Sequence, residues 1–216
     1  KLLTGNQTGS LIAWYRIKTM FDLGILNDAN KNSAVLLKTF VTSPMQDAIA
    51  AKFGIGCVNT LTGFKWISSK LQQYEDALPD DIRTRYRDLT PAESREARLT
   101  HSKFMVLGDE ESYGYMGDDF SRDKDGNGAV ILFAELAAYA ASRNLTVAGL
   151  LDEIYCEVGY FLEVNQSKVF EGAEGSATIA KLADSYAANK PTVVDGSPVK
   201  GVRDFRTDVI KDEEGI

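Results

Sequence analysis

Up to residue 74, apolar positions alternate between a helical pattern and a strand-like pattern. In residues 9–24 (GSLIAWYRIKTMFDLG), apolar side chains recur at steps of three and four residues and a glycine closes the run, which is typical of a capped helix. Short uninterrupted apolar runs indicate buried strands instead. Two such strands, each followed by a helix, are expected in chain order at 34–41, 44–52, 55–60 and 64–74. Ser43 suits the N-cap of the 44–52 helix, with Pro44 at its first position.

The middle of the chain predicts a charged excursion, a third strand and two further helices. Residues 75–100 hold two prolines and a dense mix of Asp, Glu and Arg, so we expect a solvated, partly helical excursion outside the sheet. The third strand is expected at 103–107, before a Gly- and Asp-rich loop at 108–128. The helices expected after this loop are a buried one at 129–141 and one at 146–158, with Thr146 as its N-cap.

The pattern changes again near residue 165. The elements expected here are an edge strand at 160–164, a helix at 174–189 and a hairpin at 192–205 that turns at Asp195-Gly196. No strongly apolar segment follows residue 205. We therefore expect a complete domain at 1–165 and, at 166–216, a linker and the truncated start of another, so that the chain is a piece of a longer protein.

The succession of strands and helices favours the α/β class. We expect a layered domain with a mostly parallel, mixed sheet of about four strands between helices, followed by an incomplete C-terminal segment. In such sheets, ligand sites gather in the loops at the carboxyl ends of the strands. The loops that follow the three predicted strands are therefore the candidate ligand sites.

Composition removes several classes of function. The 24 Lys and Arg against 31 Asp and Glu give a net charge of −7, which argues against nucleic-acid binding. The longest apolar run, 129–141, is shorter than the roughly 20 residues that span a bilayer, so no membrane partner is expected. Cys57 and Cys156 lack metal-type or redox-type spacing and are expected to be small buried residues of a cytoplasmic protein. His101, the single histidine, is expected on the surface.

Two loops combine residues that suit a sugar. After the second strand, residues 60–66 (TLTGFKW) offer Thr62 as a helix N-cap, Gly63 for close backbone approach, and Lys65 and Trp66 for an anion or a sugar face. After the third strand, residues 108–115 (GDEESYGY) place carboxylates and a hydroxyl between glycines, which suits a polyol ligand. An acidic surface turn would have the same composition.

The loop 121–128 (SRDKDGNG) has two interpretations besides a solvated turn. Acidic and amide residues at alternate positions suggest a calcium loop, but its twelfth position is Ala134, where a glutamate is needed. Alternatively, Arg122 and Lys124 place two cations at the start of a helix, where backbone N–H groups also favour an anion such as phosphate. Lys124 would also exchange a proton if burial or its neighbours lowered its pKa.

Four motifs in this order resemble a known family: LTGNQTG at 3–9, TLTGFKWI at 60–67, GDEESYGYM at 108–116 and RDKDG at 122–126. Together they are similar to the third domain of the alpha-D-phosphohexomutases, especially bacterial phosphoglucomutase/phosphomannomutase proteins. Residues 199–205 resemble the start of the fourth domain of that family.

The resemblance implies a four-domain enzyme that interconverts hexose 1-phosphate and hexose 6-phosphate of glucose or mannose. A phosphoserine in the first domain and Mg²⁺ bound by the second would carry out the phosphoryl transfer, and the third domain would recognise the sugar. The implied partners are the hexose phosphate and the other domains. Since neither the serine loop nor the metal loop occurs in this sequence, Mg²⁺ would have no ligand here, and we expect the 216 residues alone to have no mutase activity.

The resemblance also implies site residues in the three loops. Glu110 and Ser112 match the carboxylate and hydroxyl that hold ring hydroxyls, although Asp109 stands where the commonest form of that loop has glycine. Gly63 and Phe64 match the loop that packs on the sugar.

The cations of these loops would serve the phosphate. Lys124 matches a lysine that assists proton transfer or stabilises the moving phosphoryl group, and Arg122 and Lys65 lie near the phosphate in the family. The alternative to a mutase domain is a non-catalytic calcium-binding or carbohydrate-binding module.

Overall fold

A computed structural model describes residues 2–163 and 167–199. They belong to two compact units, of which the first ends at Leu162 and the second begins at Glu163.

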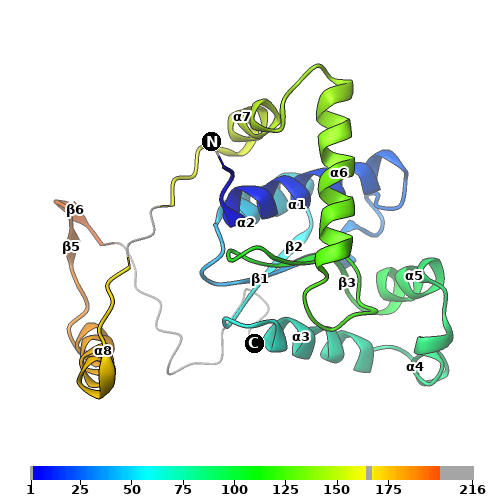
Figure 1. The fold of residues 1–216 in the computed structure, drawn as a ribbon. Coiled ribbons are helices and arrows are strands. Elements are labelled where there is room, and N and C mark those ends of the chain that lie inside the picture. The colour runs from blue at the N-terminus through cyan, green and yellow to red at the C-terminus, as the bar shows by residue number, and fades with distance from the viewer. Residues whose placement is uncertain (1, 164–166, 200–216) are drawn as a thin grey trace. The chain divides into compact units, whose positions relative to one another are not determined.

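A four-stranded sheet of order β2-β1-β3-β4 forms the centre of the first unit (Figure 1). Its strands are β1 (Ala34–Thr39), β2 (Gly56–Thr60), β3 (Phe104–Glu110) and β4 (Gly114–Met116). Strand β1 is parallel to both β2 and β3, whereas β4 is antiparallel to β3. Every residue of β1 is buried, as expected for an apolar strand between two neighbours. The prediction of a mostly parallel, mixed sheet of about four strands is confirmed.

Helices cover both faces of this sheet (Figure 1). Those of the first unit are α1 (Gly5–Asp22), α2 (Met45–Phe53), α3 (Phe64–Asp76), α4 (Asp80–Arg83), α5 (Pro91–His101), α6 (Gly126–Ser142) and α7 (Val147–Val158), with short 3₁₀ turns at Lys31–Ser33 and Tyr86–Asp88. Apolar residues of α1, α2, α6 and α7 share one core with the sheet. Residues of α3 form a second core on the other face, which gives three layers.

Helix α1 begins four residues before the predicted start at residue 9. The Thr4 side chain accepts a hydrogen bond from the Gln7 N–H at 3.1 Å, and the Gln7 side chain accepts one from the Thr4 N–H at 3.1 Å. This reciprocal capping box fixes the helix start. At Gly5, a Cβ would lie 1.8 Å from the Glu111 carbonyl oxygen, so only glycine lets α1 pack this closely on the turn after β3.

Two other helix starts differ from the prediction by one residue. Pro44 is the N-cap of α2 and not its first residue, although the Ser43 hydroxyl does accept a hydrogen bond from the Met45 N–H at 3.1 Å. Gly63, not Thr62, is the N-cap of α3, with φ 106° and no side-chain cap. Thr146 caps α7 as predicted, because its hydroxyl accepts from the Gly149 N–H at 3.0 Å.

The predicted solvated excursion at 75–100 is wrong in one respect. Helix α5 and its capping box at Thr90 lie outside the sheet as expected, but Glu75 and Arg98 are buried. A small apolar cluster that includes Leu78 and Tyr86 also forms there. Glu75 pairs with Arg87 and lies 3.8 Å from Arg98, whereas most other charged side chains of this segment are exposed as expected.

The prediction of a buried helix at 129–141 is also wrong. Only Leu136 and Ala140 of α6 are buried, whereas Val130 and Ile131 are 69% and 61% exposed. The helix packs mainly on α1, β4 and α7. Among the described residues, no single helix is long and apolar enough to cross a membrane, although α6 and α7 together pass that test as a pair bent by 84°.

The end of the first unit differs from the predictions at a strand and at a cysteine. No strand forms at 160–163, so the predicted edge strand is wrong there, and residue 164 lies outside the described residues. Cys156 is exposed, contrary to prediction, whereas His101 is exposed as predicted.

The second unit contains the predicted helix and the first part of the predicted hairpin. Its elements are α8 (Gly172–Ala188), β5 (Val193–Val194) and β6 (Ser197–Pro198). Asp195 and Gly196, at φ 47° and 74°, form the turn. The hairpin residues 200–205 lie outside the described residues, and the domain assignments 1–165 and 166–216 stay predictions.

Candidate functional site

Three predicted loops meet at the Glu110 carboxylate. Glu110 ends β3 and is buried, so it belongs to the strand and not to a loop. Its Oε1 accepts a hydrogen bond at 2.8 Å from the Gly63 N–H, which lies where β2 leads into α3. Its Oε2 lies 3.3 Å from the Nζ of Lys124, which precedes α6. The carboxylate is therefore held in one orientation from two sides.

Lys124 lies over an aromatic ring beside this carboxylate. Its Nζ is 4.7 Å from the centre of the Phe64 ring, and its side chain is 49% exposed, so the ammonium also reaches solvent. Gly114 makes this packing possible, because a Cβ there would lie 2.9 Å from both Lys124 Cε and Phe64 Cε2. Asp125 fixes the segment that carries Lys124 by donating its N–H to the Tyr115 carbonyl at 2.9 Å.

Replacing Gly63 by alanine is expected to weaken this arrangement through the backbone. A Cβ would meet only Lys65 Cγ at 4.0 Å, so space is available, but φ 106° is a conformation that residues with a Cβ rarely adopt. The strain should cost about 1–3 kcal/mol of the free energy of unfolding or turn the N–H away from Glu110. Urea unfolding and the amide chemical shift of residue 63 would measure both effects. Gly126→Ala is the control, because that glycine has open space and no left-handed φ; equal effects would contradict the prediction.

The turn after β3 presents Ser112 to solvent. Ser112 is exposed, next to Tyr113, whose φ of 64° lies in the left-handed region. The Tyr113 hydroxyl donates to the Leu3 carbonyl at 2.9 Å, and the Glu111 carboxylate accepts from the Thr39 hydroxyl at 3.3 Å. Contacts with Leu3, just before α1, and with Thr39 of β1 therefore anchor both sides of the turn, while Ser112 is exposed.

Lys65 and Arg122 do not join this cluster. Lys65 is exposed, and its Nζ lies 5.1 Å from the centre of the Trp66 ring. The Arg122 guanidinium is paired with Glu75, and its Nε donates to the Asp119 carbonyl at 3.1 Å. The structure thus groups Gly63, Phe64, Glu110 and Lys124, with Ser112 on the nearby turn, and it directs the Arg122 side chain elsewhere. The roles of all these residues stay predictions.

Asp109, which precedes Glu110, is buried, and its protonation state cannot be predicted from the sequence. Its Oδ2 accepts from the Gln46 side chain at 2.5 Å, and its Oδ1 is buried with no partner among the described residues. Burial, opposed by the Gln46 hydrogen bond, raises the pKa of this carboxyl to about 7. A carboxyl that is only partly ionised near neutral pH therefore lies directly before Glu110 in β3.

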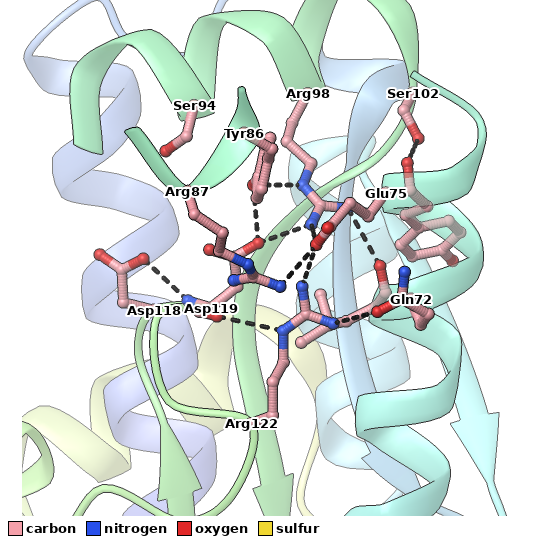
Figure 2. A network of polar contacts seen from close by, with 12 residues as sticks. Gln72, Glu75, Tyr86, Arg87, Ser94, Arg98, Ser102, Asp118, Asp119 and Arg122 are labelled. Carbon is pink, nitrogen blue, oxygen red and sulfur yellow. Dashed lines mark hydrogen bonds and ion pairs between the residues drawn. The ribbon is translucent and has the colours of Figure 1, made fainter. Parts of the chain in front are cut away.

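The sequence pattern also does not predict the network of charged side chains that the structure contains (Figure 2). Arg98 is 2% exposed and donates to the Tyr86 hydroxyl at 2.7 Å, the Asp119 carboxylate at 2.6 Å and the Leu71 carbonyl at 3.2 Å. Arg87 and Arg122 both pair with Glu75 in the same network. The only sequence signal is that Arg98 stands between Ala97 and Leu99 on the buried face of a helix.

The described residues do not fit a metal ion. No group of three or more His, Cys, Asp or Glu side chains among them could hold one. In the segment considered as a calcium loop, the Asp125 side chain caps α6 by accepting from the Gly128 N–H at 3.0 Å. The Asp123 carboxylate accepts from the Lys124 N–H at 2.7 Å. Both carboxylates thus accept hydrogen bonds from backbone N–H groups at or just before the start of α6.

Comparison with known proteins gives consistent matches. Residues 4–82 match the family model for phosphoglucomutase/phosphomannomutase, alpha/beta/alpha domain III. A phosphopentomutase of Mus musculus is 31% identical over 162 residues, 75% of this chain and 22% of that protein. A phosphoglucomutase of Staphylococcus haemolyticus (strain JCSC1435) is 29% identical over 176 residues, 82% of this chain and 28% of that protein. A phosphopentomutase of Homo sapiens is 28% identical over 212 residues, 96% of this chain and 30% of that protein.

The three-layer fold and these matches define a domain of the phosphomutase type. The chain belongs to the alpha-D-phosphohexomutase family, as the resemblance of its four motifs predicts. It spans only about a quarter of the length of the curated relatives described above, between 22% and 30%.

Proposed function

We propose that this chain recognises the sugar within a phosphosugar mutase. The observation that carries the proposal is the convergence of Gly63, Glu110 and Lys124, which come from the start of α3, the end of β3 and the segment before α6. A fixed carboxylate accepts hydrogen bonds from neighbouring sugar hydroxyls, and an ammonium at 3.3 Å from it supplies positive charge for a phosphate.

Each residue of the cluster has a distinct part in the proposal. The Glu110 carboxylate accepts from ring hydroxyls while Gly63 holds its orientation, and the accessible Ser112 hydroxyl adds a contact. Phe64 provides an apolar surface for the sugar. Lys124 pairs with the phosphate or donates a proton to an oxygen of the transferring group. Lys65 and Arg122 contribute positive charge, for which Arg122 must first leave Glu75.

The reaction of the whole protein is part of the proposal. It would interconvert the 1-phosphate and the terminal phosphate of one sugar, as the family resemblance implies for hexoses. Relatives named phosphopentomutase extend the candidate substrates to pentoses. Mg²⁺ would neutralise phosphate charge when bound by other parts of the protein, and the nucleophile would also come from there. The chain alone should therefore bind a sugar phosphate without turning it over.

Glu110→Gln is expected to weaken sugar-phosphate binding by about 10-fold or more. The amide keeps the shape and one acceptor oxygen, but it loses the charge that strengthens hydrogen bonds from hydroxyls. Glucose 1-phosphate, mannose 1-phosphate and ribose 1-phosphate would be titrated into the 216-residue chain and followed by amide chemical shifts. Glu96→Gln is the control, because Glu96 is exposed on α5 and makes the same change of charge.

Two results would contradict the proposal. One is the absence of saturable binding by the unmutated chain for all three sugar phosphates at millimolar concentration. The other is equal binding of free glucose and glucose 1-phosphate, which would indicate a carbohydrate-binding module instead. Lys124→Met is expected to abolish the preference for the phosphorylated sugar, because it removes the charge and keeps the length of the side chain.

A further inference from the structure

A small cavity lies apart from the Glu110 cluster, between α1, α5 and the start of β3. It encloses about 40 Å³, and neither Glu110 nor Lys124 lines it. Since one water needs about 10–15 Å³ measured in this way, the cavity has room for roughly three waters. A single small oxyanion requires comparable space. The polar network of Figure 2 forms one wall, with Tyr86, Arg98 and Asp119 among the lining residues.

Arg16 reaches this cavity from α1 without a hydrogen-bond partner at its Nε. That nitrogen is buried and unpaired within the part of the chain that the structure describes. The Nη1 atom lies close to Gly117, where a Cβ would be 3.1 Å away. Burial lowers the pKa of the Arg16 guanidinium, and attraction by Asp118 and Glu135 opposes this effect. Among the described residues, neither carboxylate forms an ion pair with Arg16, so its burial is only partly compensated.

A second arginine increases the positive charge of the lining. Arg95 on α5 also lines the cavity, and its charge repels that of Arg16. Arg98 and Asp119 cancel each other through their contact of 2.6 Å. Asp118 then remains against two arginines, and its Oδ1 already accepts from a backbone N–H at 2.8 Å. Among the lining residues alone, three arginines face two aspartates, an excess of one positive charge that an anion would offset and a neutral water would not. Glu135 and Glu75 do not line the cavity but attract Arg16 and Arg98 from outside it.

We propose that this cavity is a second ligand site, which binds a small oxyanion of the phosphate class between Arg16 and Arg95. Guanidinium groups suit this ligand because their planar N–H donors match the spacing of phosphate oxygens. Arg16 lines the cavity from α1 and Arg95 lines it from α5, so the guanidinium N–H groups that face the cavity would supply donors and charge, whereas the buried Nε of Arg16 is closed to a ligand. The Ser94 hydroxyl also lines the cavity. It donates its proton to the Pro91 carbonyl at 3.2 Å, so the proposal does not need it as a donor to the anion.

The site is independent of the proposed sugar site. Its cations come from α1 and α5, whereas the sugar cluster uses β3, the start of α3 and the segment before α6. The two sites are connected through residues 117–124, which begin beside Arg16 and end at Lys124, and through α3 and β3, which contribute Leu71 and Met105 to the cavity lining. Loss of sugar binding and loss of oxyanion binding can therefore be separated by mutation.

Titration of the 216-residue chain with inorganic phosphate, at constant ionic strength against chloride, tests the proposal. Calorimetry should detect saturable binding, and phosphate should raise the midpoint of thermal unfolding as mass action requires. Arg16→Met and Arg95→Met should each weaken this binding by about 10-fold or more. Lys124→Met should leave it within about twofold, because Lys124 belongs to the other site.

Several results would overturn the proposal. Phosphate that stabilises the chain no more than chloride at equal ionic strength would show that the cavity holds water alone. Unchanged phosphate affinity in both arginine variants, or affinity lost only in Lys124→Met, would place the anion at the sugar cluster. If Arg16→Met did not fold, Arg95→Met would decide alone, since Arg95 is only partly buried.

Discussion

Arg98→Met is expected to lower the free energy of unfolding by about 3–5 kcal/mol. The guanidinium is 2% exposed and donates to the Tyr86 hydroxyl and the Asp119 carboxylate at 2.7 and 2.6 Å. Methionine fills much of the same volume, but it leaves the Asp119 carboxylate, 16% exposed, without its ion-pair partner and with the Tyr86 hydroxyl, at 2.7 Å, as a neutral donor. Removal of one member of a buried ion pair has this large cost because the other charge stays desolvated. Urea unfolding followed by tryptophan fluorescence and circular dichroism would measure the loss.

The control for this prediction is Arg87→Met. Arg87 pairs with Glu75 at 2.9 Å, but its side chain is 56% exposed, so water replaces the lost partner and the expected cost is below about 1 kcal/mol. Equal losses in the two variants would mean that burial does not determine the strength of the network. A loss below 1 kcal/mol for Arg98→Met would show that Asp119 can turn to solvent.

Asp109→Asn is expected to make the chain more stable at pH 8 and to remove part of its pH dependence. Burial raises the pKa of Asp109 from 3.8 to about 7, so the folded state binds a proton more tightly than the unfolded state. The contribution of Asp109 to the free energy of unfolding is largest below about pH 4. It decreases as the pH rises to about 7 and is constant above that. The shift corresponds to as much as about 4 kcal/mol, at 1.36 kcal/mol for each pKa unit.

Urea unfolding of both proteins between pH 4.5 and 8.5 would test this prediction. All other groups titrate in both proteins, so the difference between the two curves isolates Asp109. That difference should favour Asp109→Asn at pH 8 and shrink as the pH falls, because the amide keeps an oxygen for the Gln46 bond at every pH. Parallel curves over the whole range would show that the carboxyl is ionised in the fold without penalty.

Some of the site was predictable because it follows from local pattern and sheet topology. Apolar runs place β1, β2 and β3, and parallel strands bring their carboxyl ends to one edge. The meeting of Gly63 and Glu110 is a consequence of that edge, whereas Lys124 reaches it from the segment after the antiparallel strand β4.

Other features depend on partners that no local pattern specifies. Arg122 looked like an anion ligand because it lies two residues from Lys124, yet Glu75, 47 positions earlier, pairs with it. Asp109 and Glu110 are adjacent acidic residues, but their side chains point to opposite faces of β3, which buries one against Gln46 and directs the other to Lys124. The apolar run of α6 predicted burial, but burial requires a second surface to cover it, which the described residues do not supply.

The bond between the Gly63 N–H and the Glu110 carboxylate joins residues 47 positions apart, across the β1–β3 pairing. Such a non-local contact requires a long loop to close before the contact is gained. Ligand affinity at this carboxylate would therefore report on completed folding, because species with β1, β2 and α3 in place but β3 unpaired would lack the acceptor. A stopped-flow experiment that follows both ligand capture and helix formation would show whether recovery of the binding function trails recovery of the secondary structure.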